Sequence, residues 1–210
     1  MAIETKEKSI KLVEALGNGI WVVRWNFKPV LDENGNETEV NSYEEEAYNW
    51  IPSIEDIQRT ITEWHNKQTD GLIKHGFEWN GIKVLLSDEN KFNFSLFAIE
   101  AERRENAIKK WDEENPEMAG INSVEREIIL EDGAKEMIPM PTGRPSSRIP
   151  ITFKLSENNE ANSFYTFETL DELFEFTSAS ADHLQGAYAA GWYKIATFNW
   201  MDYVQALSEL

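Results

Sequence analysis

Apolar and polar side chains alternate along residues 20–28, IWVVRWNFK, which is typical of a β-strand. One face of this strand carries Trp21, Val23, Trp25 and Phe27. An Asn34-Gly35 turn follows, and residues 40–50 return as a second strand of weaker alternation. The pattern predicts an N-terminal β-hairpin, preceded over residues 2–15 by a short, frayed helix.

Three later segments combine helical spacing of apolar residues with a start signal. Ser53 and Asp56 have the spacing of a capping box, as do Thr169 and Glu172, and Ser87 precedes two acidic residues. These signals predict helices over residues 53–68, 87–114 and 169–195. The apolar spacing of the second helix predicts a buried stripe formed by Phe92, Leu96, Ile99, Ile108 and Trp111.

Two further β-hairpins are expected, one before each of the last two helices. Residues 77–86 alternate around Asn80-Gly81, and residues 151–167 form two alternating runs around a loop at 157–160. Because an isolated two-stranded hairpin is marginal in water, we expect the two hairpins to share one antiparallel sheet. The predicted fold class is α+β, with two β-hairpin–helix units sharing that sheet, plus the N-terminal hairpin.

This organisation divides the chain into an N-terminal hairpin and attachment segment, residues 1–52, and a hairpin–helix domain, residues 53–210. Residues 116–148 break the pattern, because they are rich in proline and glycine and offer one short strand candidate at 127–131. We interpret them as an irregular insertion within the second domain. Long insertions of this kind are usually functional or mobile.

The insertion carries apolar side chains that are costly to leave in water, and Arg144 and Arg148 form a small basic island in an acidic chain. We therefore expect it to contact a partner protein, although a loop folded back onto its own domain is the alternative. The candidate partner contacts are Ile128, Leu130, Met137, Ile138, Met140, Arg144 and Arg148.

The net charge narrows the possible partners. The 210 residues carry a formal charge of −18, and a polyanion repels the phosphate backbone, so direct binding of nucleic acid is disfavoured. Without any cysteine the chain can form neither disulfides nor thiolate zinc sites, which fits folding in a reducing cytoplasm. No apolar stretch reaches ~18 residues, so insertion into a membrane is not expected.

Catalytic and metal-binding patterns are absent from the sequence. The histidines His65, His75 and His183 have no ligand-type partner at metal-binding spacing, and Asp32 to Asn36 fits a turn better than a calcium loop. The carboxylate runs are typical of solvated faces rather than of tuned acid–base pairs. We therefore expect no enzymatic activity, no catalytic or metal-binding residues and no cofactor.

The tryptophans offer one further possibility, which is a platform for stacking sugar rings. The residues concerned are Trp21, Trp25, Trp64 and Trp79. Their alternation with other apolar residues favours a place in the core instead.

Residues 53–195 resemble a domain of unknown function found near the C-terminal end of phage and prophage tail proteins, including those of gut Bacteroidales phages. The resemblance rests on ITEWHNKQTD, GFEWNGIKVLLSDENKFN, IPITFKL and FYTFETLDELFEFTSASADHLQGAYAAGWYKI. It implies a hairpin, a polar helix start, then a second hairpin before a helix with an internal histidine, here His183. It implies a virion or tail-assembly setting and no reaction.

The sequence and this resemblance together predict a structural or adaptor protein of a phage virion, associated with the tail and assembled in the bacterial host cytoplasm. Its expected partners are other virion proteins, in a homo- or hetero-oligomer. One alternative is an acidic, phage-encoded inhibitor of a basic host protein. Another is a carbohydrate-binding module of a tail fibre.

Overall fold

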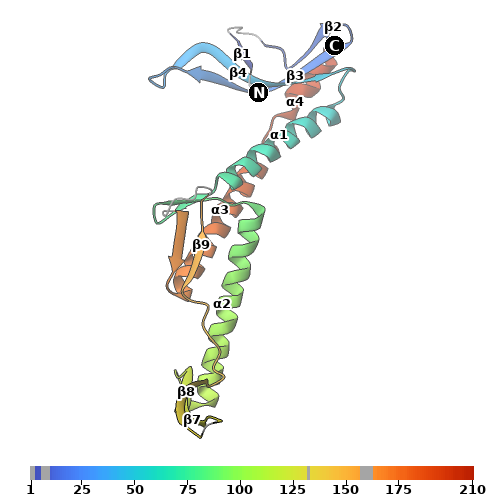
Figure 1. Cartoon of the computed structure of the whole chain (residues 1–210). Coiled ribbons are helices and arrows are strands. Elements are labelled where there is room, and N and C mark those ends of the chain that lie inside the picture. Colours follow the sequence, from blue (N-terminus) through green and yellow to red (C-terminus); the bar gives the residue numbers. More distant parts are fainter. Residues whose placement is uncertain (1–2, 6–9, 132, 157–162) are drawn as a thin grey trace. The chain divides into compact units, whose positions relative to one another are not determined.

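The computed structural model describes residues 3–5, 10–131, 133–156 and 163–210 (Figure 1). The chain forms two compact units: Met1–Gly71 with Ala187–Leu210 makes unit 1, and Leu72–Gly186 makes unit 2. The boundary expected at residue 52 therefore lies inside unit 1, while the loop expected at 157–160 lies outside the described residues. None of the described helices has the length and apolar character needed to cross a membrane.

Unit 1 contains a four-stranded antiparallel sheet with strand order β1-β4-β3-β2. Its strands are β1 (Ile3–Thr5), β2 (Val13–Gly17), β3 (Ile20–Leu31) and β4 (Glu37–Tyr48). The expected hairpin is confirmed as β3–β4. In its turn, a carboxylate oxygen of Asp32 accepts hydrogen bonds from the N–H groups of Asn34, at 2.8 Å, and Asn36, at 2.9 Å. The residues of the faint calcium-loop pattern thus form the turn.

The expectation of a helix over residues 2–15 is wrong. The described parts of this segment contain β1 and β2, which pair with β4 and β3 on the two sides of the hairpin. Strand addition satisfies the backbone hydrogen-bonding groups of the segment through residues distant in the sequence. Local sequence therefore carried little information about it.

The core of unit 1 lies between this sheet and the helices α1 (Ile54–His75) and α4 (Trp200–Ser208). Its buried side chains are Val13, Val23, Trp25, Tyr48, Ile57, Ile61 and Tyr203. The Tyr203 hydroxyl donates to the backbone oxygen of Arg24 at 2.7 Å, which fixes α4 to the sheet. Trp25 belongs to this core and Trp21 and Trp64 pack against it, so the core interpretation of these tryptophans is confirmed.

The expected start of α1 is also confirmed. The Asp56 N–H donates to the Ser53 hydroxyl at 3.1 Å, and the Ser53 N–H donates to the Asp56 carboxylate at 3.2 Å. This reciprocal pair is a capping box with aspartate in place of glutamate. The helix continues beyond residue 68 to His75.

Unit 2 contains two short hairpins and the long helices that follow them, together with a third hairpin described below. The elements are β5 (Phe77–Trp79), β6 (Ile82–Val84), α2 (Asp88–Glu114), β9 (Ile151–Lys154), β10 (Phe164–Phe167) and α3 (Leu170–Ala196). The expected Asn80-Gly81 turn is confirmed, with φ of 46° and 76° at these two residues. The α+β class is likewise confirmed.

The two hairpins do not share one sheet, which corrects that part of the expectation. Among the described residues, β5–β6 and β9–β10 are separate two-stranded sheets, and the Leu85 N–H donates to the Leu155 oxygen at 2.9 Å just beyond them. Side-chain packing joins the hairpins instead. The Phe176 ring, fully buried on α3, lies 5.4 Å from that of Trp79 and 5.0 Å from that of Phe167, measured between centroids.

The buried stripe of α2 is displaced from the one expected. Phe94, Ala98, Ala101 and Ile108 are its buried residues. Phe92 is 67% exposed and Ile99 is 64% exposed, so of the expected stripe only Ile108 is buried. The small side chains of the two alanines allow neighbouring elements to approach α2 closely. Phe94 contacts the Phe153 and Phe176 rings at centroid distances of 5.4 and 4.9 Å.

Residues 116–148 are more regular than expected. A 3-10 turn, η1 (Pro116–Met118), leads into β7 (Ser123–Ile129), which pairs antiparallel with β8 (Lys135–Pro141). The interpretation as an irregular insertion is therefore wrong over residues 116–141. Pro139 and Pro141 obscured β8 in the sequence, because proline is poorly tolerated in strands other than edge strands.

Candidate functional site

The β7–β8 hairpin has an apolar face. The register pairs Val124 with Met140, Arg126 with Ile138 and Ile128 with Glu136, so each pair lies on the same side of the hairpin. Leu130 continues this side, because its N–H bonds to the Ala134 oxygen at 2.8 Å. This side also carries Arg126 and Glu136. We define its apolar side chains, Val124, Ile128, Leu130, Ile138 and Met140, as the apolar face.

This face is incompletely covered by the rest of the chain. Leu130 is 39% exposed and Met140 is 38% exposed, and Val124, Ile128 and Ile138 are partly exposed. A two-stranded hairpin has little stability of its own in water. The face is therefore suited to burial against another protein.

The opposite side of the hairpin has a mixed character. It carries Ile129 and Met137, which are 70% and 54% exposed, among glutamates and prolines. The structure therefore separates the apolar candidate contacts. Ile128, Leu130, Ile138 and Met140 come together on one face, and Met137 points to the other.

The base of the hairpin is fixed to the end of α2 through one carboxylate. Asp112 accepts two hydrogen bonds from the Arg144 guanidinium, both at 2.7 Å, and a third from the Gly120 N–H at 3.2 Å. Arg144 also donates to the Asn122 side-chain oxygen at 3.1 Å. The bond from Arg144 holds the pKa of Asp112 below its ordinary value, so the ion pair persists at neutral pH.

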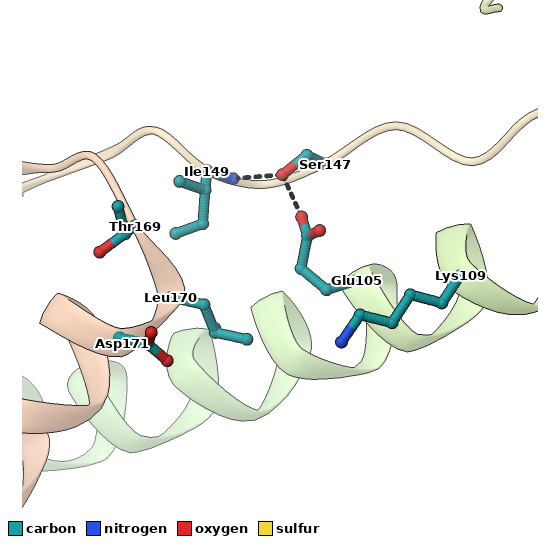
Figure 2. Close-up of a pocket in the computed structure, with 7 residues that line it drawn as sticks. All are labelled: Glu105, Lys109, Ser147, Ile149, Thr169, Leu170 and Asp171. Atoms are coloured by element: carbon teal, nitrogen blue, oxygen red, sulfur yellow. Dashed lines mark hydrogen bonds between the residues drawn. The ribbon is translucent and has the colours of Figure 1, made fainter. Parts of the chain in front are cut away.

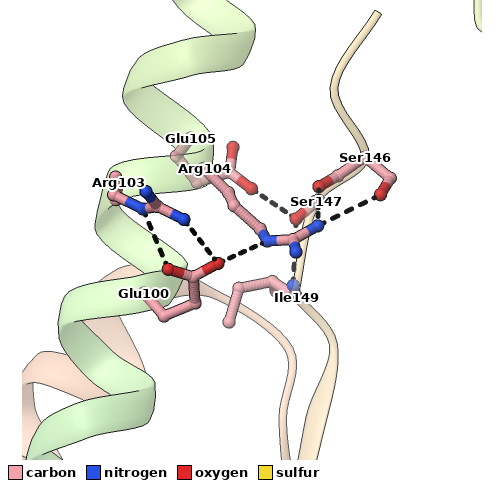
Figure 3. Close-up of polar contacts among 7 residues, drawn as sticks. All are labelled: Glu100, Arg103, Arg104, Glu105, Ser146, Ser147 and Ile149. Atoms are coloured by element: carbon pink, nitrogen blue, oxygen red, sulfur yellow. Dashed lines mark hydrogen bonds and ion pairs between the residues drawn. The ribbon is translucent and has the colours of Figure 1, made fainter.

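A second set of polar contacts fastens the segment after Arg144 to α2 (Figure 3). The Arg104 guanidinium donates to the backbone and hydroxyl oxygens of Ser146, both at 3.4 Å. The Ser147 hydroxyl donates to the Glu105 carboxylate and accepts the Ile149 N–H at 2.9 Å. Residues 146–149 therefore follow the surface of α2 along defined contacts.

Arg104 is itself oriented by a carboxylate on its own helix. Glu100 accepts hydrogen bonds from Arg103 at 2.9 Å and Arg104 at 2.8 Å, as Figure 3 shows. These two bonds lower the pKa of Glu100 from 4.5 to about 2. The carboxylate is thus charged wherever the protein is folded at ordinary pH, and it keeps Arg104 directed at the segment.

A cavity of about 370 Å³ lies beside this segment (Figure 2). Glu105 and Lys109 of α2 line it on one side, and the start of α3, Thr169 to Asp171, lines it on the other. Its hydroxyls are already engaged, because Ser147 bonds to Glu105 and the Thr169 oxygen accepts the Glu172 N–H at 3.2 Å. The cavity has room for a small polar molecule, but its lining contains no nucleophile paired with a histidine.

The two arginines among the candidate contacts have different surroundings. Arg144 is bound within the chain by Asp112, so it positions the hairpin rather than offering a free charge. Arg148 is exposed and has no hydrogen bond or ion pair to any other described residue. Two residues of the site, Val124 and Asp112, were not predicted from the sequence. The alternation of polar and apolar residues from Ser123 to Ile129 was a weak signal for Val124.

The three histidines lie in separate places. His75 lies beside the Lys83 ammonium at 2.6 Å, His183 faces the Leu72 oxygen at 3.3 Å, and His65 packs against the Phe198 ring. Within the described ranges of the chain, no three His, Asp or Glu side chains converge as a metal site would need.

Compared with protein-family models, with curated proteins and with solved structures, the chain matches none of them. The resemblance of residues 53–195 to phage tail domains therefore stays a prediction from sequence.

Proposed function

We propose that this chain is a structural or adaptor protein of a phage particle, associated with the tail and acting through protein–protein contacts. The observation that carries the proposal is the apolar face of the β7–β8 hairpin, fixed at its base by Asp112 and Arg144. The resemblance of residues 53–195 to tail domains supports the setting. In this proposal the chain is assembled in the host cytoplasm and joins other virion proteins, or further copies of itself.

The fixed base matters for binding. A freely moving arm loses conformational freedom when it docks, and that loss weakens association. Here the Thr142 N–H closes the hairpin on the Asn122 oxygen at 3.0 Å, and Arg144 ties the same region to α2. The apolar face therefore has a fixed orientation relative to the end of α2, as a docking element requires.

A second function is favoured by one observation, the charge of −18. An acidic protein made by a phage can occupy a basic host protein, since complementary charge steers association. This inhibitor would act in the host cell and would not be a component of the particle.

Mass spectrometry of gradient-purified particles of the encoding phage separates the two functions. The structural role predicts the chain in the particles at a fixed ratio to the major capsid protein. A matched sample of infected-cell lysate serves as the control for carry-over. A chain found in the lysate but absent from particles, and bound there to one basic host protein, would show that the inhibitor function is the right one.

A further inference from the structure

A groove in unit 1 lies between the edge strand β2 and helix α4, remote in sequence from the β7–β8 hairpin. Its volume is about 610 Å³. Leu12, Trp21 and Ala206 contribute apolar lining, and residues 13–15 of β2 line one side. A groove with apolar side chains beside a strand edge is a common arrangement for binding an extended peptide.

The outer edge of β2 is unpaired among the described residues, because the strand order ends there. The Arg24 N–H donates to the Leu12 oxygen at 2.8 Å, so Leu12 and Glu14 are the positions that bond to β3. In an antiparallel pair the alternate residues turn their backbone groups the other way. Val13 and Ala15 therefore direct their N–H and C=O groups to the open edge.

The α4 side of the groove is acidic. Asp202 and Glu209 line it, and a separation of seven residues places them roughly 10 Å apart along the helix. Both accept hydrogen bonds from neutral amides: the Asn199 side chain donates to Asp202 at 2.8 Å, and the Gln205 side chain donates to Glu209 at 3.0 Å. Among the described residues neither carboxylate is paired with a cation.

The third carboxylate of the groove already has a cationic partner. Glu14 forms an ion pair with Arg24 at 2.7 Å, and Arg24 is also bound by Glu45 at 2.6 Å. Lys11 is the one basic residue of the lining. The unpaired carboxylates of Asp202, on α4, and Glu209, directly after it, thus leave the groove with an excess of negative charge, which complements a basic ligand.

We propose that this groove binds an extended peptide segment of a partner protein that carries lysine or arginine, added to the open edge of β2 as a further strand. The peptide backbone bonds to Val13 and Ala15. Alternate apolar side chains pack on Trp21, and the basic side chains reach Asp202 and Glu209. The inference rests on the proposed function in that the chain acts through protein contacts, but it concerns a second surface.

The test uses the full chain and two short, acetylated and amidated peptides, one of alternating valine and lysine and one of alternating valine and glutamate. Nuclear magnetic resonance of the labelled protein follows the amides of β2. The lysine peptide is expected to shift the Val13 and Ala15 amides and to slow their hydrogen exchange. The glutamate peptide is expected to leave them unchanged.

Two test variants and one control variant distinguish the contribution of the β2 edge from that of the acidic side chains. Asp202→Asn with Glu209→Gln should weaken binding of the lysine peptide about fivefold, whereas Glu37→Gln with Glu39→Gln, an equal charge loss on β4, should change it less than twofold. Ala15→Pro should abolish binding without loss of a bond to β3, since proline lacks only the outward N–H. Circular dichroism confirms that each variant is folded.

Three outcomes would overturn the inference. The first is equal binding of both peptides, and the second is amide shifts confined to residues outside the groove. The third is dimerisation of the free protein that Ala15→Pro abolishes, because the edge would then pair with a second copy. If the chain is found in particles but the lysine peptide does not bind, this inference fails while the proposed function stands.

Discussion

Asp112 at the end of α2 and Arg144 after β8 form a two-bonded fork, with both nitrogen–oxygen distances at 2.7 Å. The same carboxylate accepts the Gly120 N–H, so one side chain joins the helix to both ends of the hairpin. Geometry of this kind restrains two segments in direction as well as in distance.

Asp112→Asn should loosen the base of the hairpin. We expect faster hydrogen exchange at the Gly120 and Thr142 amides and little change in the midpoint of global unfolding, because the fork fixes a peripheral element. Arg148→Gln is the matched control, since Arg148 is exposed and has no side-chain partner within the described chain. Unchanged exchange in Asp112→Asn would mean that the fork does not fix the hairpin.

Glu100 gives a prediction for the pH dependence. Its pKa is lowered in the folded protein from 4.5 to about 2, chiefly by the hydrogen bond from Arg103 and then by that from Arg104. The stability that these contacts contribute is therefore complete above pH 4.5 and is lost as the pH falls toward 2. In a carbon-detected titration, Arg103→Gln should raise the Glu100 midpoint and Lys110→Gln should not. A wild-type midpoint at 4.5 would contradict the geometry.

The displaced stripe of α2 can be tested with two matched substitutions. Phe94→Ala removes a buried ring of α2 that packs on Phe153 and Phe176, and should lower the free energy of unfolding by about 3–5 kcal/mol. Phe92→Ala removes an exposed ring and should change it by less than about 0.5 kcal/mol. Chemical denaturation measures both. A large loss of stability for Phe92→Ala would instead support the buried stripe expected from the sequence.

The α2 stripe shows a limit of prediction from helical spacing. Phe92, Leu96 and Ile99 have the helical spacing of a buried face, yet they are exposed. The residues buried beside them are Phe94, Ala98 and Ala101. Spacing identifies the apolar positions of a helix but does not identify which of them another element will cover. That choice depends on the β9–β10 hairpin, whose Phe153 reaches Phe94 across the sequence.

Local signals, by contrast, located most elements. The Ser53–Asp56 box and the Asn80-Gly81 turn are satisfied within a few residues, so they could be read directly. The candidate contacts were found by their apolar character. The division of these contacts into two faces could not be predicted, because it depends on the β7–β8 register. The pairing of Arg144 with Asp112 could not be predicted either, because Asp112 lies on another element.

Two glycines of α3 should respond oppositely to alanine. A Cβ at Gly186 meets no atom within 4 Å, so Gly186→Ala should stabilise the helix by about 0.5–1 kcal/mol. A Cβ at Gly191 would lie 2.2 Å from the Thr69 hydroxyl oxygen, so Gly191→Ala should destabilise unit 1 by about 1–3 kcal/mol. Thermal unfolding gives the sign of each effect. Adding Thr69→Ala should recover part of the loss, and the absence of any recovery would contradict the close approach.

We propose that the apolar face of the β7–β8 hairpin docks the chain into a particle, and this can be measured directly. We would quantify incorporation by mass spectrometry of purified particles for Leu130→Ser with Met140→Ser, and for Ile129→Ser with Met137→Ser as the control on the opposite side. We expect at least about a fivefold loss of incorporation for the first pair, since a few central side chains dominate most interfaces, and wild-type incorporation for the control. Wild-type incorporation of the Leu130 and Met140 variant, folded and equally abundant in the lysate, would contradict it.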